Sequence, residues 1–253
     1  MSFSICAVVP HFNHSLAIEP VISRLSEAEL EVLVVDDASQ DAHRKRVAGM
    51  QAPGVQVLFR EVNGGKGAAM LDGLRAAWLA GYTHALQIDA DGQHDTGDIP
   101  SLLREAQAHQ QAVITAAPIF AEDAPPIRLI GRKLTNFWVA VETLSLSSLD
   151  TMCGFRVYPL GPVLAILGSY RPGLRMNFDI EVLVRSIWEG IDVREIPSRV
   201  SYPSDGLSHF RPVADNALIT LAHVRLVLGM LIRSPQLIAR KLRSSDIESA
   251  AAL

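Results

Sequence analysis

The chain has 253 residues, 49% of them hydrophobic and 20% charged, which is the composition of a globular protein that buries one substantial core. Its formal net charge of -4 excludes a strong positive field, so we expect no nucleic-acid partner, and any bound anion must be held at a local site. The two cysteines lie in unlike contexts without metal-ligand spacing, and we expect both to be reduced thiols.

Short apolar runs alternate with helical patterns in the first half of the chain. This alternation is typical of βαβ units around a mostly parallel, buried sheet. The sequence therefore predicts an α/β fold with helices flanking the sheet. Strands are expected at residues 5–9, 31–35, 55–59, 85–88 and 112–116, and helices at residues 17–25, 42–50, 67–81 and 99–109.

The second half of the chain is less regular. We expect one α/β domain over residues 1–212 and a helical appendage over residues 213–253. The predicted elements are a helix at 127–144, a turn at 153–155, a helix at 179–189, a strand at 193–196, a polar loop at 202–211 and C-terminal helices.

Polar clusters follow four of the predicted strands, after Val9, Val35, Phe59 and Ile88. Ligands of open α/β sheets bind outside the carboxyl ends of the strands, so all four clusters are expected at one edge of the sheet. The most informative cluster is the Asp-Ala-Asp-Gly-Gln sequence at residues 89–93. Two carboxylates one residue apart can hold a hard divalent cation and leave positions open for phosphate oxygens. The alternative is a polar turn that merely ends a strand.

Two further clusters contain carboxylates and glycines. Asp36 and Asp37 can accept hydrogen bonds from a nucleobase or a ribose, while Ser39 can cap the next helix. The Asn-Gly-Gly-Lys-Gly loop at residues 63–67 lets the backbone approach a ligand at a helix amino terminus, where Lys66 adds a positive charge. Taken alone, this loop fits an ordinary glycine-rich turn better than a ligand site.

In this order the motifs resemble the inverting family 2 glycosyltransferases, and among them the dolichyl- and polyprenyl-phosphate mannose and glucose synthases. The similarity runs from near the start to about Tyr202. It rests on Pro10-His11-Phe12-Asn13, Asp36-Asp37-Ala38-Ser39, Asn63-Gly64-Gly65-Lys66-Gly67-Ala68, Asp89-Ala90-Asp91-Gly92-Gln93-His94, Gly131-Arg132-Lys133, Asp150-Thr151-Met152-Cys153-Gly154-Phe155-Arg156 and Phe178-Asp179-Ile180-Glu181.

The resemblance implies a GT-A fold, a nucleotide diphosphate sugar as donor and Mg²⁺ or Mn²⁺ as cofactor. Asp89, Asp91 and Gln93 would bind the metal, which stabilises the leaving diphosphate while the acceptor attacks from the opposite face and inverts the anomeric carbon. The residues expected around the nucleotide sugar are Pro10, Phe12, Asn13, Asp36, Asp37, Asn63, Lys66, Asp89, Ala90 and Arg156.

The expected catalytic residues are Asp91, Asp179, Glu181 and Arg132. Arg132 matches an arginine that holds the acceptor phosphate in the lipid-phosphate synthases, whereas for Arg156 a structural ion pair is an equal alternative to a substrate contact. Asp179 and Glu181 stand two positions apart near a helix start, so one of them should face the site. That carboxylate is the candidate general base for a hydroxyl acceptor, and a phosphate acceptor needs none. Stabilisation of the helix amino terminus is the alternative.

The chain departs from the family pattern at two places. Residues 116–120 read Ala-Ala-Pro-Ile-Phe, where the lipid-phosphate synthases carry a phosphate-binding arginine. His14 stands where the family prefers a glutamate, which leaves the base of the donor open between uracil and guanine. The loop at 202–211 resembles the flexible acceptor loop, with His209 and Arg211 directed at phosphate or acceptor.

The apolar stretch at 218–242 fits two interpretations. It is a core helix, the interpretation we favour, or an amphipathic helix resting on a membrane with Arg233, Arg240, Lys241 and Arg243 reaching lipid phosphates. Its most apolar part, residues 218–232, is shorter than the roughly 20 residues that span a bilayer. The chain start lacks a basic region and a cleavage site, so we expect no signal peptide and a cytoplasmic protein, peripheral at the inner membrane face if the acceptor is a lipid.

The hypothesis is a metal-dependent inverting glycosyltransferase that moves a hexose to a lipid or lipid-like acceptor. One alternative is a sugar-1-phosphate nucleotidyltransferase, although the loop after the first strand lacks the glycine-rich, arginine-containing pattern that such an enzyme requires. The other alternative is a nucleotide-sugar-binding or lipid-binding module without turnover.

Overall fold

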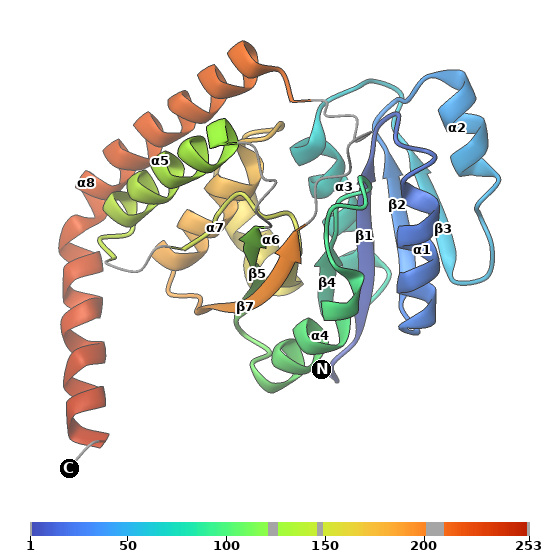
Figure 1. Cartoon of the computed structure of the whole chain (residues 1–253). Coiled ribbons are helices and arrows are strands. Elements are labelled where there is room, and N and C mark those ends of the chain that lie inside the picture. Colours follow the sequence, from blue (N-terminus) through green and yellow to red (C-terminus); the bar gives the residue numbers. More distant parts are fainter. Residues whose placement is uncertain (1, 121–125, 146–148, 201–209, 252–253) are drawn as a thin grey trace.

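A seven-stranded sheet crosses the molecule, with helices on both of its faces (Figure 1). The computed structural model describes residues 2–120, 126–145, 149–200 and 210–251. The strand order is β3-β2-β1-β4-β6-β5-β7, and β6 alone among these runs antiparallel to its neighbours. The strands are β1 (Ile5–His11), β2 (Glu31–Asp36), β3 (Val55–Phe59), β4 (His84–Gln87), β5 (Val113–Phe120), β6 (Arg156–Pro159) and β7 (Val193–Val200).

The predicted α/β fold with a mostly parallel sheet is confirmed. The apolar runs become strands because both faces of the sheet are covered, so nearly every side chain of the central strands is buried. The helices are α1 (Ile18–Glu27), α2 (Asp41–Ala48), α3 (Lys66–Leu79), α4 (Ile99–Ala108), α5 (Pro126–Glu142), α6 (Leu160–Gly168), α7 (Phe178–Trp188) and α8 (Pro212–Ala251), with a short 3-10 helix η1 (Thr96–Asp98) before α4.

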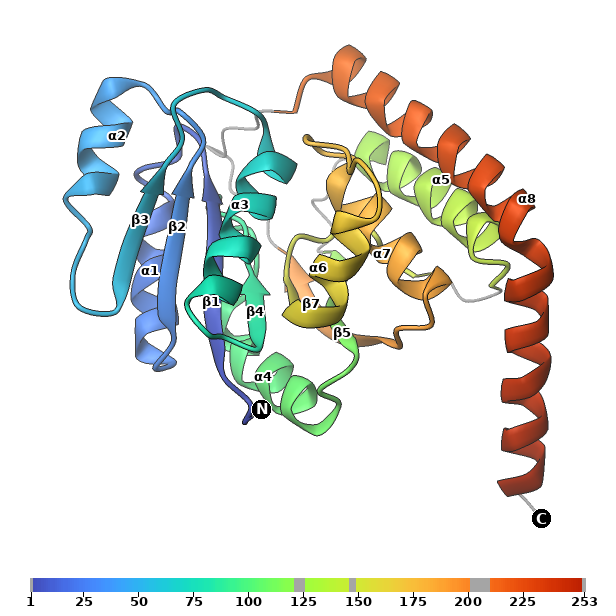
Figure 2. The same cartoon turned by 180° about the vertical axis from the view of Figure 1, so that it is seen from behind.

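Each face of the sheet has its own hydrophobic core. Helices α1 and α4 bury Ile18, Leu25 and Leu102 on one face, and α3, α6 and α7 cover the other (Figures 1 and 2). Helix α3 lies close to the sheet because residue 73 is glycine, where an added Cβ would lie 3.0 Å from Cγ2 of Val35. This close approach fixes the start of α3 at the sheet edge where the polar clusters lie.

Two elements, β6 and α6, were not predicted from the sequence. Strand β6 begins at Arg156, a charged residue that normally argues against a buried strand, and α6 follows it without a loop. Strand β5 also extends to Phe120, beyond the predicted end, because it pairs in parallel with β7 over its whole length.

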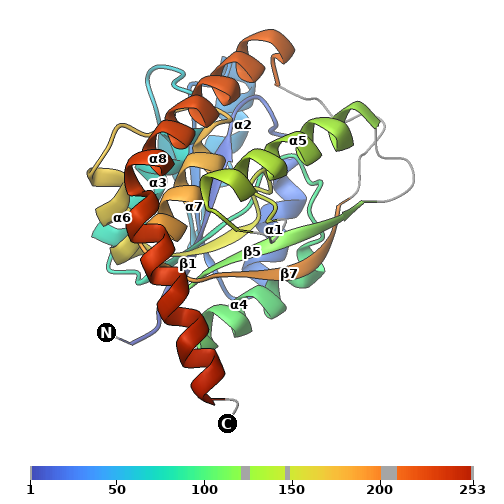
Figure 3. The ribbon, with the colours of Figure 1, turned by 90° about the vertical axis from the view of Figure 1, so that its left-hand side faces the viewer.

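The C-terminal region forms one long helix, α8, of 40 residues, instead of the several helices expected. Together with α5 it forms the outer layer on one side of the molecule (Figure 3). A third core joins α5, α7 and α8 through Val139, Val184 and Leu226. The segment Pro212–Arg243 has the length and hydropathy of a membrane-spanning helix, and 28% of its most apolar window is buried. The division into residues 1–212 and 213–253 stays a prediction.

A buried polar contact fastens α8 to α5. Nδ1 of His223 lies 2.7 Å from Oε1 of Glu142, and Nε1 of Trp188 donates a hydrogen bond of 2.8 Å to the main-chain oxygen of Glu142. Burial raises the pKa of Glu142, an effect that the contact with His223 opposes. The contact therefore fixes α8 against the body at the level of α7.

Glu142→Ala is expected to lower the free energy of unfolding by about 3 kcal/mol, because it leaves His223 buried without its partner. Glu142→Gln should cost less, since an amide oxygen still accepts a hydrogen bond from the imidazole. Urea unfolding followed by circular dichroism measures both values. Glu19→Ala, at an exposed glutamate, is the control and should change the free energy by at most about 0.5 kcal/mol. Equal losses in the three variants would contradict the expectation.

Candidate active site

The polar clusters meet at one edge of the sheet, as the sequence predicts. The parallel strands β1, β2 and β4 end there, and the antiparallel strand β6 begins there, because Arg156 pairs with Gln87 at the end of β4. The first turns of α3 and α7 reach the same edge, since both helices cover one face of the sheet. Six elements therefore contribute side chains to one site.

Lys66 is the central residue of this edge. Its ammonium lies 2.8 Å from Oδ1 and 2.9 Å from Oδ2 of Asp89, and 2.8 Å from Oδ2 of Asp179. The contact joins the first residue of α3, the end of β4 and the first turn of α7. Burial alone would lower the pKa of Lys66, but the two carboxylates raise it above its ordinary value, so the side chain stays charged.

The carboxylates of residues 89 and 91 have different electrostatic environments. Burial opposes ionisation of Asp89, yet the charge of Lys66 and contacts with His94 hold its pKa well below the usual range. The pKa of Asp91 is raised, first by burial and then by the negative charge of Asp89. Burial also disfavours the charged form of His94, but Cys153 and Asp89 raise the pKa of this imidazole to about 10.

Asp89 and Asp91 fit a divalent cation that takes its other ligands from a bound diphosphate. Oδ1 of Asp89 is buried and accepts no hydrogen bond from the described residues, although Lys66 lies beside it. Oδ1 of Asp91 accepts a hydrogen bond of 3.0 Å from the main-chain nitrogen of Gln93, which shapes the turn. Among the described residues no group of three or more His, Cys, Asp or Glu side chains forms a metal site. The arrangement therefore fits a shared cation and not one enclosed by protein ligands alone.

The loop at residues 63–67 is organised by Asp37. The carboxylate of Asp37 accepts hydrogen bonds from the main-chain nitrogens of Gly64 (2.9 Å) and Gly65 (2.6 Å) and pairs with Arg60. Nδ2 of Asn63 donates to the main-chain oxygen of Asp37 at 3.0 Å. Asp37 thus supplies the negative charge at the amino terminus of α3. The loop amides are used within the protein, and the effect of the loop is to position Lys66.

Asp36 lies fully buried beneath the site, not at its surface. Its Oδ1 accepts a hydrogen bond of 2.8 Å from Nδ1 of His11, and its Oδ2 accepts one of 3.2 Å from the main-chain nitrogen of Ser39. Burial would raise the pKa of Asp36, but these two partners hold it below its usual value. Asp36 therefore joins β1 to β2, and its expected contact with the nucleotide stays a prediction.

The end of β1 is locked to the loop after β2. The main-chain nitrogen of Asn13 donates to Oγ of Ser39 at 3.0 Å, and its Oδ1 accepts from the main-chain nitrogen of Gln40 at 2.9 Å. Asn13 adopts a positive φ of 56°, which asparagine tolerates better than most residues. Pro10 and Phe12 lie half-buried at this corner, where a nucleobase was predicted, and Ala90 is buried beside Asp89.

Arg156 is completely buried, and its guanidinium is hydrogen-bonded within the protein. Its Nε donates to Oγ1 of Thr115 at 3.1 Å, and one terminal nitrogen donates to the main-chain oxygen of Asp179 at 2.8 Å. The guanidinium is thus a structural support that holds the first turn of α7 at the sheet edge. A substrate contact of Arg156 stays a prediction.

Asp179 and Glu181 face different ways, as their spacing predicts. Asp179 points to Lys66 and also accepts a hydrogen bond of 3.0 Å from Nε2 of Gln87. Glu181 accepts hydrogen bonds from Nδ2 of Asn177 (2.8 Å) and the main-chain nitrogen of Gly173 (3.3 Å), so it stabilises the turn before α7. Its burial raises its pKa. Of this pair, Asp179 belongs to the site.

Arg132 reaches the site region from α5. Its Nε lies 2.9 Å from Oδ2 of Asp150, and its guanidinium stacks over the ring of Phe120 at 4.9 Å. Oδ1 of Asp150 accepts hydrogen bonds of 3.0 Å from the main-chain nitrogens of Met152 and Cys153. Arg132 is therefore linked to the Cys-Gly-Phe turn, in which Gly154 lies against Lys66 and Asp89.

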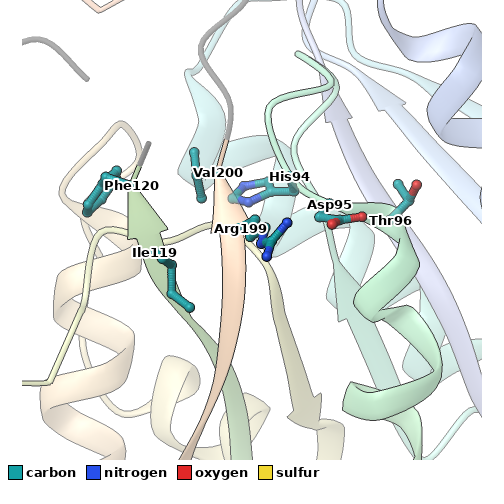
Figure 4. A pocket seen from close by; sticks show the side chains of 7 residues that line it. All are labelled: His94, Asp95, Thr96, Ile119, Phe120, Arg199 and Val200. Atoms are coloured by element: carbon teal, nitrogen blue, oxygen red, sulfur yellow. The ribbon is translucent and has the colours of Figure 1, made fainter. Parts of the chain in front are cut away.

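A cavity of about 530 Å³ opens beside these groups, between the ends of β5 and β7 and the loop after β4 (Figure 4). Arg199 stands opposite Ile119 in the β5–β7 pairing and is exposed, and the ring of His94 lies on the same side of β7. Nδ1 of His94 is buried without a hydrogen-bond partner among the described residues. The cavity is lined by His94, Asp95, Thr96, Ile119, Phe120, Arg199 and Val200.

Sequence reasoning missed several residues that shape the site. Gln87 and Tyr158 form a buried chain to Asp179, in which the hydroxyl of Tyr158 donates to Oε1 of Gln87 at 3.1 Å. A glutamine inside the apolar run at 85–88 was the available signal, because a buried amide needs a partner. Arg199 carried no such signal, and His94 was noted only as the last residue of the motif at residues 89–94. The predicted acceptor loop lies largely outside the described residues, which resume at Phe210.

The contacts of Lys66 with Asp89 and Asp179 make the free energy of unfolding depend on pH. Replacing Lys66 is expected to reverse the sign of this dependence. In the native chain the depressed pKa of Asp89 adds stability that is complete above about pH 4 and is lost as the pH falls below it. In Lys66→Met the carboxylates of Asp89 and Asp179 repel each other at neutral pH. This variant should therefore gain stability as the pH falls and these groups take up protons.

The free energy of unfolding in urea, measured from about pH 4 to about pH 8, checks this sign. Lys66→Arg keeps the positive charge and is the control, with a pH dependence close to that of the native chain. Parallel pH curves for the native chain and Lys66→Met would contradict the assignment of Lys66 as the counter-ion of both carboxylates.

Known proteins share this pattern of sequence and fold. The family model for glycosyl transferase family 2 matches residues 6–146, more than half of the chain. The undecaprenyl-phosphate mannosyltransferase of Micrococcus luteus is 27% identical over 209 residues, which cover 76% of this chain and 82% of that protein. The polyprenol monophosphomannose synthase of Mycolicibacterium smegmatis is 27% identical over 198 residues, which cover 75% of this chain and 74% of that protein.

A solved structure shows the same fold. The glucosyl-3-phosphoglycerate synthase of Mycobacterium tuberculosis, crystallised with Mn²⁺ and UDP-glucose, matches with a TM-score of 0.66 and 18% identity, over 90% of this chain and 79% of that chain. The predicted GT-A type of fold and the resemblance drawn from the motifs are thereby confirmed. On the strength of the family match and of the strand-end site, the chain belongs to glycosyl transferase family 2.

Proposed function

We propose that the chain is an inverting glycosyltransferase that moves a hexose from a nucleoside diphosphate sugar to a polyprenyl phosphate. The observation that carries the proposal is the position of Lys66, held between Asp89 and Asp179 next to the cavity that contains Arg199. One side of this cluster offers a place for a leaving diphosphate, and the other offers a place for an anionic acceptor. The names of the two bacterial relatives point to lipid phosphates as acceptors of those proteins.

On the donor side, the charge of Lys66 and that of a bound metal ion would stabilise the leaving diphosphate. Lys66 stays protonated and lies where negative charge develops on the diphosphate, so it stabilises the departure without a proton transfer. Asp89, Asp91 and Gln93 would hold Mg²⁺ or Mn²⁺, which supplies further positive charge to the leaving group when bound. Pro10 and Phe12 offer apolar contact for the base at the end of β1.

On the acceptor side, the cavity carries cationic groups. Arg199 is exposed in it, and His94, with its raised pKa of about 10, presents a positive ring beside it. A guanidinium binds phosphate through two hydrogen bonds while keeping its charge. Arg199 thus offers a cation in the region where residues 116–120 lack one. A phosphate oxygen is already ionised, so this acceptor requires no general base.

Inversion follows from the state of the nearby carboxylates. A double displacement needs a carboxylate that is free to attack the anomeric carbon. Asp179 is buried and bound to Lys66 and Gln87, and Asp89 is bound to Lys66. A single displacement by the acceptor, with these carboxylates positioning the cations, is the simpler mechanism.

Calorimetric titration with UDP and GDP, each with and without Mn²⁺, tests the donor site. We expect one nucleotide to bind with Mn²⁺ and the binding to be lost in Asp91→Asn, while Asp192→Asn, at an exposed aspartate near the far end of β7, binds normally. Failure of both nucleotides to bind under every condition would refute the proposal. Binding without transfer of labelled sugar to a short-chain polyprenyl phosphate would identify a module without turnover instead.

Arg199→Gln should raise the KM for a short-chain polyprenyl phosphate by about 10- to 100-fold, the effect of losing one hydrogen-bonded charge pair. Nucleotide binding should stay unchanged, because the cavity lies on the acceptor side. Arg194→Gln changes an arginine of the same strand outside the cavity and is the matched control. Steady-state kinetics with both variants measure the effect. An unchanged KM in Arg199→Gln would move the acceptor away from this cavity.

A further inference from the structure

Helix α8 has a second apolar face that packs against nothing in the described part of the chain. Its inward face buries Ile219, Leu226 and Met230. Its outward face presents large apolar side chains three, four or seven positions apart, which places them on one stripe of the helix. Leu228, Leu231 and Ile232 are exposed to 57%, 58% and 80%. The stripe also contains Leu221 and Val224.

Helix α5 carries a matching stripe. Ile130, Leu134, Phe137 and Trp138 are exposed at helical spacing, while Val139 faces the core. Helices α5 and α8 pack side by side as the outermost layer (Figure 3), and the exposure of both stripes places them on the solvent side of that layer. We call the combined area the α5/α8 surface, which consists of Ile130, Leu134, Phe137, Trp138, Leu221, Val224, Leu228, Leu231 and Ile232.

The exposed charges among the described side chains of α5 and α8 have one sign. The two carboxylates among the described side chains of α5 and α8 are Glu142 and Asp215, and both are buried. Glu142 is paired with His223, and Asp215 accepts a hydrogen bond from the main-chain nitrogen of Arg211. Among the described side chains of these helices, the exposed ionisable residues are Lys133, Arg225, Arg240, Lys241 and Arg243. Arg240 donates to the main-chain oxygens of Ile187 and Trp188, and Lys241 contacts the main-chain oxygen of Leu144, so the basic residues that border the α5/α8 surface are Lys133, Arg225 and Arg243. This local excess of positive charge contrasts with the net charge of -4 of the whole chain.

We propose that the α5/α8 surface docks on an anionic lipid bilayer. Large apolar side chains on one face of a helical layer enter the boundary between headgroups and acyl chains, and the surrounding lysines and arginines meet lipid phosphates. Phe137 and Trp138 add aromatic rings of the kind enriched at this depth. This inference goes beyond the proposed function and does not depend on it, because it rests on exposure and charge alone.

The same observations disfavour two other occupants. A symmetric contact with a second copy would oppose this surface to itself and bring its basic residues together without carboxylates to balance them. A membrane-spanning α8 would have to leave the core that holds Leu226 and Met230 and to break the buried contact between His223 and Glu142. Resting on the membrane keeps both features.

Sedimentation of the full chain with vesicles tests the proposal. We expect binding to vesicles of phosphatidylcholine with phosphatidylglycerol and much weaker binding to phosphatidylcholine alone, with added salt removing most of the difference. The double variant Leu228→Gln, Ile232→Gln should lower the partition coefficient roughly tenfold or more. The matched control is Val62→Gln, Leu79→Gln, two residues exposed to 74% and 85% outside the α5/α8 surface, which should bind like the native chain.

Three results would overturn the proposal. The first is equal binding to neutral and anionic vesicles, and the second is an equal loss of binding in the control variant. The third is a dimer in sedimentation equilibrium that Leu228→Gln dissociates, because it would show that a second copy covers the surface. Urea unfolding of each variant shows that the fold is kept.

Sugar transfer provides a separate readout. Vesicle binding is measured without donor or acceptor, so it does not depend on the proposed activity. Transfer to a short-chain, water-soluble acceptor should be unchanged in the double variant, whereas transfer to a long-chain acceptor in anionic vesicles should fall with binding. A parallel fall of both activities would contradict the inference, because it would place Leu228 and Ile232 in the support of the catalytic site.

Discussion

One ammonium group holds the candidate active site together. Lys66 contacts Asp89 and Asp179, and these residues belong to elements that are far apart in sequence. Further hydrogen bonds hold these residues in position. The loop that carries Lys66 is bound to Asp37, and Asp179 accepts hydrogen bonds from Gln87 and Arg156. The positions of α3, β4 and α7 therefore depend on the same charge that a leaving diphosphate would meet. The contacts of Lys66 with Asp89 and Asp179 therefore bear on both the stability of the fold and the proposed chemistry.

The carboxylates at the strand ends are of two kinds: one pair is hydrogen-bonded within the protein, and the other pair is available to a ligand. Asp36 and Asp37 are both buried, and their oxygens are used by His11, Ser39 and the glycine-rich loop. Oδ1 of Asp89 is buried and has no hydrogen bond from the described residues, and the pKa of Asp91 is raised by burial and by the negative charge of Asp89. Unsatisfied or electrostatically strained carboxylates are those that gain most from an added cation, so Asp89 and Asp91 are the stronger candidates for the proposed metal site.

The sequence predicts the parts of the structure that are determined by residues close together in the chain. Apolar runs and helical periodicity give strands β1 to β4 and the edge at which their loops meet. Strand β6 and helix α6 were not predicted, because Arg156 is buried only through partners on other elements, including Thr115. The hydrogen bonds of Asp36 and Glu181 were not predicted for the same reason, since the partners that occupy a carboxylate are residues brought together by folding. The cavity at Arg199 depends on the β5–β7 pairing, which no local pattern specifies.

The close approach of Gly154 to Lys66 and Asp89 influences how the molecule responds to ionic strength. An added Cβ at residue 154 would lie 2.6 Å from Nζ of Lys66, so the turn covers one side of the ion pair and displaces part of the surrounding water. Exposed pairs such as Arg24–Glu27 are screened within a Debye length of about 8 Å in physiological salt, whereas covered pairs are screened much less. Attraction between α8 and an anionic surface belongs to the screened class. If α8 docks on lipid as proposed, salt should release the protein while the edge that holds Lys66 stays assembled, which separates attachment from the integrity of the candidate site in one preparation.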